Sequence, residues 1–221
     1  MRSRSRVLGL LAILCIAILA VYKGRPDFSN ASKPARGIAD SVTALQLARN
    51  VDEVDDVLGE APSPDREAMR IKQYIDFAFI PAYVALYAAV GLLFGSRLGV
   101  FVAVCGVATG IFDVIENFGI LRILDVPLSQ TTQAMVDSIR HPSLAKWTLA
   151  ACATAGVGWL FWRAGGWIMR LIGGLNLIAA ALVFCGLFDN ALLVPAGLPT
   201  LAGLILVAIF GVWGRLKAPS R

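Results

Sequence analysis

Three polar side chains stand together near the end of a long apolar stretch: Asp113, Glu116 and Asn117. Their spacing of i, i+3 and i+4 puts them on one face of a helix. A charge inside a bilayer costs at least ~2.5–3.5 kcal/mol, so such residues are seldom without a role. Two carboxyl groups this close need a bound proton or a shared cation, and Lys146 is the first candidate for that cation. Asp113 and Glu116 are therefore the candidate catalytic residues.

Other polar residues fall at the ends of neighbouring apolar stretches, at a similar depth. Asp76 and Tyr83 share one face of their stretch, Lys146 opens another, and Asp189 with Asn190 closes a third. The sequence thus predicts a polar site to which several helices contribute. The candidate ligand-binding residues are Asp76, Tyr83, Asp113, Glu116, Asn117, Lys146, Asp189 and Asn190.

Three interpretations of this polar group stay open. The carboxylate oxygens of four residues could bind a hard cation: Asp76, Asp113, Glu116 and Asp189. Asp113 and Glu116 could instead form a proton site coupled to movement or catalysis. Finally, contacts of Asp113 with Lys146 and of Asn117 with Asp76 could simply hold helices together. Our prediction includes no metal and no other cofactor.

Composition decides what kind of chain carries these residues. Of its 221 residues, 57% are hydrophobic and only 16% are charged, whereas soluble domains have about 25% charged residues. This excludes a disordered chain, a nucleic-acid-binding tail and a secreted disulfide scaffold. It indicates an integral membrane protein, because a bilayer tolerates so much exposed apolar surface.

Six stretches are long and apolar enough, or nearly so, to be membrane helices, and none has the alternation of a barrel strand. They are 7–22, 74–94, 98–121, 144–162, 168–188 and 192–213. The first follows Arg2, Arg4 and Arg6 and also fits a signal peptide, although its cleavage site is poor. We therefore expect an all-α bundle of six spans, or five if the first is removed. The expected domains are an anchor or signal-like helix (1–22), an outer segment (23–73), a membrane bundle (74–214) and a tail (215–221).

Charge distribution predicts the orientation. With the N-terminus in the cytoplasm, the cytoplasmic segments hold nine cations and no acid, which fits the positive-inside rule. Those cations are Arg2, Arg4, Arg6, Arg97, Arg163, Arg170, Arg215, Lys217 and Arg221. The expected location is the cell (inner) membrane, with both termini cytoplasmic and the polar site on the extracytoplasmic side.

The outer segment 23–73 is polar and short. Apolar residues recur at helical spacing within 38–58, which predicts two short amphipathic helices separated by a capping pair, Asn50 and Glu53. Gly59 is expected to end the second, and Ser63 and Pro64 to begin a helix that continues into the membrane. A lid over the site and a surface-lying spacer fit equally well. We place His141 and Pro142 in a later outer loop.

Four motifs together resemble an uncharacterised family of bacterial multipass membrane proteins. They are TALQLARNVDEVDDVLGE (43–60), YIDFAFIPAY (74–83), DVIEN (113–117) and AKW (145–147). In that family an amphipathic outer segment precedes a Tyr-x-Asp-Phe helix, an Asp-x-x-Glu-Asn helix and a lysine-bearing helix. The resemblance supports the choice of Asp76, Asp113, Glu116, Asn117 and Lys146 and implies no known activity.

Function can be predicted only by class. We expect the site to bind or transfer a small or lipid-like ligand, and the apolar inner half favours a half-depth pocket over a transport path. One alternative is an outer-leaflet enzyme acting on a lipid or its head group, with Glu116 or Asp113 as general base and Lys146 or Arg122 binding an anionic group. Another is a structural or assembly protein. The lipid bilayer is the expected partner, nucleic acid is not, and protein partners stay unspecified.

Overall fold

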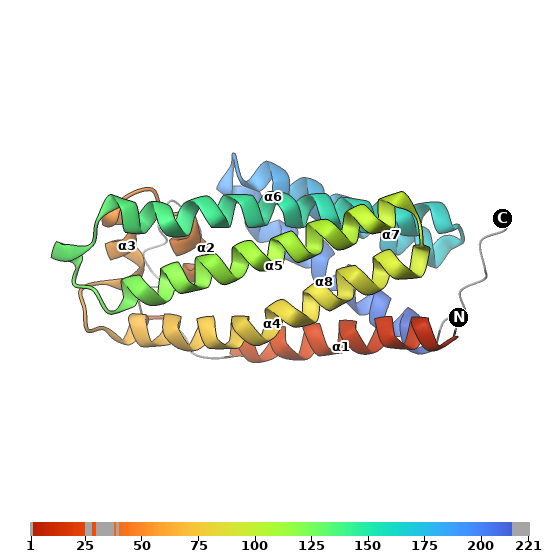
Figure 1. Ribbon diagram of the computed structural model, residues 1–221, viewed down its shortest axis with the longest axis horizontal. Helices are drawn as coiled ribbons and strands as arrows, with labels where there is room; N and C mark the ends of the chain where they lie inside the picture. Colours follow the sequence, from red (N-terminus) through yellow and green to blue (C-terminus); the bar gives the residue numbers. More distant parts are fainter. Residues whose placement is uncertain (1, 25–27, 30–37, 39, 214–221) are drawn as a thin grey trace.

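The computed structural model describes residues 2–24, 28, 29, 38 and 40–213. The protein is an all-α helical bundle, as the sequence predicts, and six of the described helices are long and apolar enough to cross a membrane (Figure 1). This fits an integral, multi-pass membrane protein. The elements are α1 (Arg2–Gly24), α2 (Ser41–Gln46), α3 (Val51–Leu58), α4 (Pro64–Phe94), α5 (Arg97–Leu124), η2 (Leu128–Gln130), α6 (Gln133–Ala164), α7 (Trp167–Gly186), η3 (Asn190–Leu192) and α8 (Leu193–Trp213).

The six long helices form a closed ring. Each packs mainly against two neighbours, in the order α1, α4, α5, α6, α7, α8 and back to α1. We call the end that carries α2 and α3 the cap end, and the end with the α4–α5 and α6–α7 turns the base (Figure 1). A ring of helices leaves its centre to side chains alone, so the size of those side chains decides whether the centre is filled.

Helices on the two sides of the ring differ in length. Helices α4, α5 and α6 have 31, 28 and 32 residues, whereas α1, α7 and α8 have 23, 20 and 21. A difference of roughly nine residues corresponds to about 14 Å of helix. The longer helices extend furthest at the cap end, where α2 and α3 lie beside them (Figure 1).

Helices α2 and α3, which we call the cap, begin and end as the sequence predicts. The Asn50 side chain accepts a hydrogen bond of 2.9 Å from the backbone N–H of Glu53, and this N-cap starts α3. Gly59 ends α3 with a φ of 63°, which glycine adopts without a steric penalty. Ser63 is the N-cap of α4, which continues from outside into the span, confirming that prediction as well.

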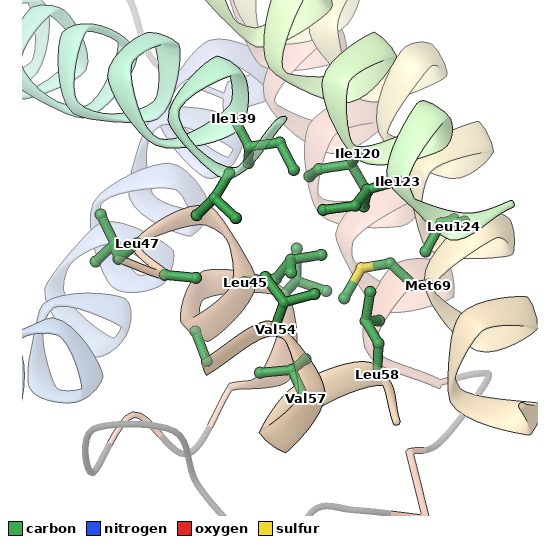
Figure 2. Packing of buried hydrophobic residues seen from close by; sticks show 14 of the residues in the cluster. Leu45, Leu47, Val54, Val57, Leu58, Met69, Ile120, Ile123, Leu124 and Ile139 are labelled. Carbon is green, nitrogen blue, oxygen red and sulfur yellow. The ribbon is translucent and has the colours of Figure 1, made fainter. Parts of the chain in front are cut away.

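The cap packs across the end of the bundle through its apolar face. Figure 2 shows Leu45 of α2 and Val54 and Leu58 of α3 turned toward Met69 of α4 and Ile120 of α5. All five side chains are fully or almost fully buried. Short helices gain most of their stability from such packing, so the cap is held by the extended parts of α4, α5 and α6.

Arg66 ties the cap to the end of α5. Its side chain is 1% exposed. Its Nη1 donates to the carbonyls of Ile123, Leu124 and Val126 at 2.9, 3.1 and 3.0 Å. Its Nε donates to the carbonyl of Gly59 at 3.0 Å. The last carbonyls of a helix have no partner within the helix, so Arg66 satisfies those of α5 and fixes the end of α3 beside them.

The placement of His141 and Pro142 in a loop is wrong, because both lie within α6, which begins at Gln133. The first turns of α6 are too polar for lipid, which hid the helix from a search for apolar stretches. Val136 and Ile139 are nevertheless 1% exposed and belong to the core beneath the cap. The cap therefore covers the apolar side chains in these first turns of α6, which the membrane does not cover.

At the base, three helix pairs approach so closely that their backbones touch. The contacts are Gly9–Gly211 between α1 and α8, Gly91–Gly99 between α4 and α5, and Gly158–Gly173 between α6 and α7. A Cβ on Gly173 would lie 2.7 Å from the carbonyl oxygen of Gly158, which leaves no room for any side chain. Small residues permit this kind of approach between membrane helices, and here they draw the ring together.

Candidate functional site

The ring encloses a cavity of about 400 Å³ to which all six long helices contribute. Its lining is polar toward the cap end and apolar toward the base. The polar lining includes Asp76, Tyr83, Asp113, Lys146 and Trp147, with Tyr22, Lys23, Asp40, Thr43 and Gln46 closer to the cap. Four of the eight residues that the sequence singled out thus line one cavity.

Lys146 is the centre of the polar network. Its Nζ donates to Asp113 Oδ1 at 2.9 Å and to Glu116 Oε1 at 2.8 Å. The three side chains are 7%, 7% and 0% exposed, so the ion pairs are buried. The sequence-based expectation of a shared cation is met, because one ammonium lies between both carboxylates. Buried pairs of this kind depend on each partner, since an unpaired charge in the interior is costly.

Glu116 also joins the cap to the bundle. Gln46, at the end of α2, donates from Nε2 to Glu116 Oε1 at 2.7 Å, and Ser143 of α6 donates to Glu116 Oε2 at 2.5 Å. Trp147 donates from Nε1 to Gln46 Oε1 at 3.3 Å. Sequence reasoning missed Gln46 and Ser143 as site residues. The sequence could have indicated Ser143, because it lies one helical turn before Lys146. Nothing in the sequence pattern indicated Gln46.

Asp113 and Asp76 have partners on neighbouring helices. The Tyr83 hydroxyl donates to Asp113 Oδ2 at 2.8 Å, and Asn117 Nδ2 donates to Asp76 Oδ2 at 2.8 Å. Both contacts named in the helix-holding interpretation, Asp113 with Lys146 and Asn117 with Asp76, are thus present in the structure. Asp76 Oδ1 accepts no hydrogen bond from the described parts of the chain, so that oxygen is available to a molecule in the cavity.

The two candidate catalytic carboxylates differ in access. Asp113 lines the cavity, whereas Glu116 is fully buried behind the lining, with its oxygens turned to Lys146, Gln46 and Ser143. A group inside the cavity can therefore reach Asp113. Glu116 contacts the lining through Lys146 and Gln46, so it can only position these two side chains for such a group.

Asp189 and Asn190 lie outside this cluster. Asp189 accepts a hydrogen bond of 3.1 Å from the backbone N–H of Ala191 and starts η3 after α7 has ended. Neither residue belongs to the cavity lining. Counting depth along each stretch put them level with Asp113, but the chain leaves the helical path at Gly186. The Asp189 side chain therefore caps a turn, and neither residue continues the cavity-facing side of α7.

Below the polar network the cavity is deep and mostly apolar, although the hydroxyls of Tyr87 and Thr154, which are hydrogen-bonded to each other, and the amide of Asn176 also line it. Leu86 and Val90 of α4, Val157 of α6 and Val207 of α8 line it, and so does Ala180 of α7. Val90 and Val157 stand close to the base ends of their helices. The cavity therefore extends further than the half-depth pocket that the sequence suggests.

The opening toward the cap carries an exposed ion pair. Lys23 Nζ lies 3.0 Å from Asp40 Oδ1, and both side chains are exposed by more than a third. Burial alone would raise the pKa of the Asp40 carboxyl. The Lys23 ammonium and the hydrogen bonds from Thr43 outweigh burial and hold the pKa below its ordinary value of 3.8. Asp40 also serves as the N-cap of α2, so this charge belongs to the cap.

Within the described ranges, no group of three His, Cys, Asp or Glu side chains is placed to hold a metal ion. The site offers a different chemistry. It presents hydrogen-bond acceptors, one ammonium shared by two carboxylates, and aromatic rings, above an apolar chamber.

Comparisons with known proteins give no match: no family model, no curated protein and no solved structure resembles this chain significantly. Function is therefore argued from the geometry and chemistry of the cavity.

Proposed function

We propose that the protein binds a lipid-like molecule in the central cavity, with the polar head beside Asp76, Asp113 and Lys146 and the hydrocarbon part directed toward the base. The observation that carries this proposal is a single cavity, about 400 Å³ in volume, that changes from polar to apolar along its length. An amphiphile matches such a gradient, whereas an ion or a small polar metabolite would leave the apolar part unused.

Size and lining support an organic ligand. Pockets for small molecules typically measure ~300–1,000 Å³ and are mostly apolar, with a few placed polar groups. The apolar chamber beside Val90, Val157 and Val207 favours a hydrocarbon chain, because burying each CH₂ contributes about 0.8 kcal/mol. A bilayer supplies such chains directly.

Charge favours a head group that donates hydrogen bonds or carries positive charge. Carboxyl groups at and directly behind the polar lining outnumber the ammonium groups, even when Lys72 beside Tyr22 is counted. The carboxyl groups are those of Asp40, Asp76, Asp113 and Glu116, and the ammonium groups of the lining are those of Lys23 and Lys146. Both lining ammonium groups are already paired, so an anionic head would find no free ammonium group in the lining.

The arginine-rich base supports the membrane orientation that we propose. Positive residues accumulate on the cytoplasmic side of membrane proteins, and Arg97, Arg163 and Arg170 lie at or beside the base turns. We therefore place the cap and the cavity opening on the extracytoplasmic side, where a ligand from the outer leaflet would enter beside Lys23 and Asp40.

Native mass spectrometry of gently extracted protein tests the proposal. We expect an amphiphile to be retained, and Ala180→Phe, which fills the cavity, to abolish the adduct. Ala181→Phe is the matched control, because the neighbouring residue on α7 is exposed and outside the lining. Absence of any amphiphile adduct in wild type, or equal retention by both variants, would overturn the proposal.

Head-group preference has its own test. Dodecylamine should displace the adduct at lower concentration than dodecanoate, which has the same chain length. Asp76→Asn should reduce this difference, because it removes the charge beside the free oxygen while keeping a partner for Asn117. Equal competition by the two amphiphiles would refute the charge argument and leave the cavity itself as the binding site.

A further inference from the structure

A second hollow lies at the base, on the outside of the ring, on the other face of α7 from the central cavity. It is a groove of about 650 Å³ between the end of α6 and the start of α7. Trp162 and Trp167 border it beside Arg170, and Gly174, Leu175 and Ile178 continue it along α7. The groove is thus polar and aromatic at the base and apolar toward the middle of the bundle.

The described charges at the base are all positive. The charged side chains described at the base are arginines: Arg6, Arg97, Arg163 and Arg170. Every Asp and Glu that the structure describes lies in the cap half or at the α7–α8 turn. For Arg170 the described part of the chain supplies no ion-pair partner. An anion in the groove would meet attraction from Arg170 and no nearby carboxylate.

The start of α7 adds backbone donors to this charge. Gly165 and Gly166 form the turn with φ values of 79° and 81°, and no side chain caps the helix that follows. The first backbone N–H groups of a helix have no partner within it and favour an anion. Arg170 stands in the first turn, so its guanidinium and these N–H groups lie at the same end of the groove.

We propose that this groove binds an anionic phospholipid from the leaflet at the base. Its phosphate would lie beside Arg170 and the start of α7, its glycerol region between Trp162 and Trp167, and one acyl chain along Leu175 and Ile178. Three observations carry the proposal: the single sign of charge, the tryptophans typical of the membrane interface, and the exposed apolar surface of Ile178, which is 55% exposed. Basic pockets between membrane helices recognise anionic head groups by this combination.

Lipid exchange followed by native mass spectrometry tests the site. The protein is transferred into nanodiscs that contain equal amounts of a phosphatidylglycerol and a phosphatidylcholine with the same chains, and is then released for analysis. We expect wild type to retain phosphatidylglycerol selectively. Arg170→Gln should lower that retention about fivefold, the order expected for one arginine near an anionic lipid surface.

Arg97→Gln is the matched control, because Arg97 is at the same end but starts α5 in another hairpin. It should retain phosphatidylglycerol like wild type. Equal loss in both variants would overturn the groove as the site and leave only general attraction by a basic surface. Equal retention of both lipids by wild type would overturn the preference for an anion.

A second variant separates the groove from the helix terminus. A Cβ on Gly174 would lie 3.6 Å from the Trp162 ring, an ordinary contact, so Gly174→Leu extends into the groove without disturbing the α6–α7 contact at Gly173. We expect Gly174→Leu to reduce phosphatidylglycerol retention while Arg170 is kept. Unchanged retention would show that the acyl chain does not use the groove, and would overturn the proposal.

Discussion

The two ends of this bundle are closed by opposite means. At the base, helices meet backbone to backbone at glycine pairs such as Gly158 and Gly173. Toward the cap end, α5 also approaches α6 closely at Gly119, but the helices and the cap are joined there through the side chains of Lys146, Glu116 and Gln46. Backbone contacts between packed helices hold one fixed geometry, whereas hydrogen bonds to side chains break and form again without unfolding a helix. We therefore expect the cap end, and not the base, to be the end that can open.

This contrast matters for the cavity. The glycine contacts draw the helices together at the base, below the cavity. Access then depends on α2, because Gln46 and Asp40 both belong to the cavity lining. If the proposed ligand binds at the centre, its binding and any movement of the cap would be coupled, since both would involve the same side chains.

Removing the buried ammonium of Lys146 near the cap end is expected to have the largest effect on stability. Lys146→Met leaves Asp113 and Glu116 buried without their shared ammonium, and removal of one partner from a buried ion pair costs ~3–5 kcal/mol. We expect a large drop in the thermal unfolding temperature in detergent.

The triple variant Lys146→Met, Asp113→Asn and Glu116→Gln is the control, because it removes the charges together. It should recover much of the lost stability. An unfolding temperature of Lys146→Met equal to that of wild type would show that the buried pairs do not hold the helices.

Breaking the base has the next largest effect. Gly173→Val places a side chain against the backbones of Gly158 and Trp162, and overpacking of this kind costs typically ~1–3 kcal/mol. Gly197→Val is the matched control, because a Cβ there has open space around it. The unfolding temperature in detergent should fall for Gly173→Val and stay close to wild type for Gly197→Val. If the two variants fall equally, backbone contact is not what closes the base.

Much of this architecture could be predicted because it depends on neighbours in the sequence. Apolar stretches give the spans, and the capping pair Asn50–Glu53 gives the start of α3. Residues Asp113, Glu116 and Asn117 share a helix face by spacing alone. The sign of charge then suffices to pair Lys146 with the two carboxyl groups.

What could not be predicted depends on how separate helices are placed. No periodicity in one helix states that six helices form a ring, so the depth of the cavity was missed. Gln46 reaches Glu116 only because the cap docks on the extended ends of α4, α5 and α6. Asp189 lies outside the cavity lining because α7 ends before it, which a count along a straight helix does not show.

A smaller effect is expected where the cap is joined to the network. Gln46→Leu removes a hydrogen bond to a charged group, which contributes ~1.5–3 kcal/mol. The cap should then open more often and expose Cys15, which lines the cavity. In a protein whose other cysteines are replaced by serine, we expect a neutral maleimide to label Cys15 about tenfold faster, the factor that corresponds to 1.4 kcal/mol.

Gln130→Leu is the control for this change, because Gln130 is exposed on η2 and away from the lining. It should leave the labelling rate unchanged. Equal rates for wild type and Gln46→Leu would mean that Cys15 is reached by another route, and the proposed access through the cap end would be wrong.

The smallest expected effect is a dependence of cap stability on pH, which the base should not share. Because the folded protein lowers the pKa of Asp40 below 3.8, its ionised form stabilises the cap above that value. This contribution is lost as the pH falls through the lower folded pKa. Exposed ion pairs contribute only ~0.2–1 kcal/mol, so the readout must be local: hydrogen-exchange protection of the α2 amides. Asp40→Ser keeps an N-cap without the charge and should remove the pH dependence. Persistence of the same dependence in Asp40→Ser would trace it to another carboxyl group of the cap end, since the base has none among the residues described.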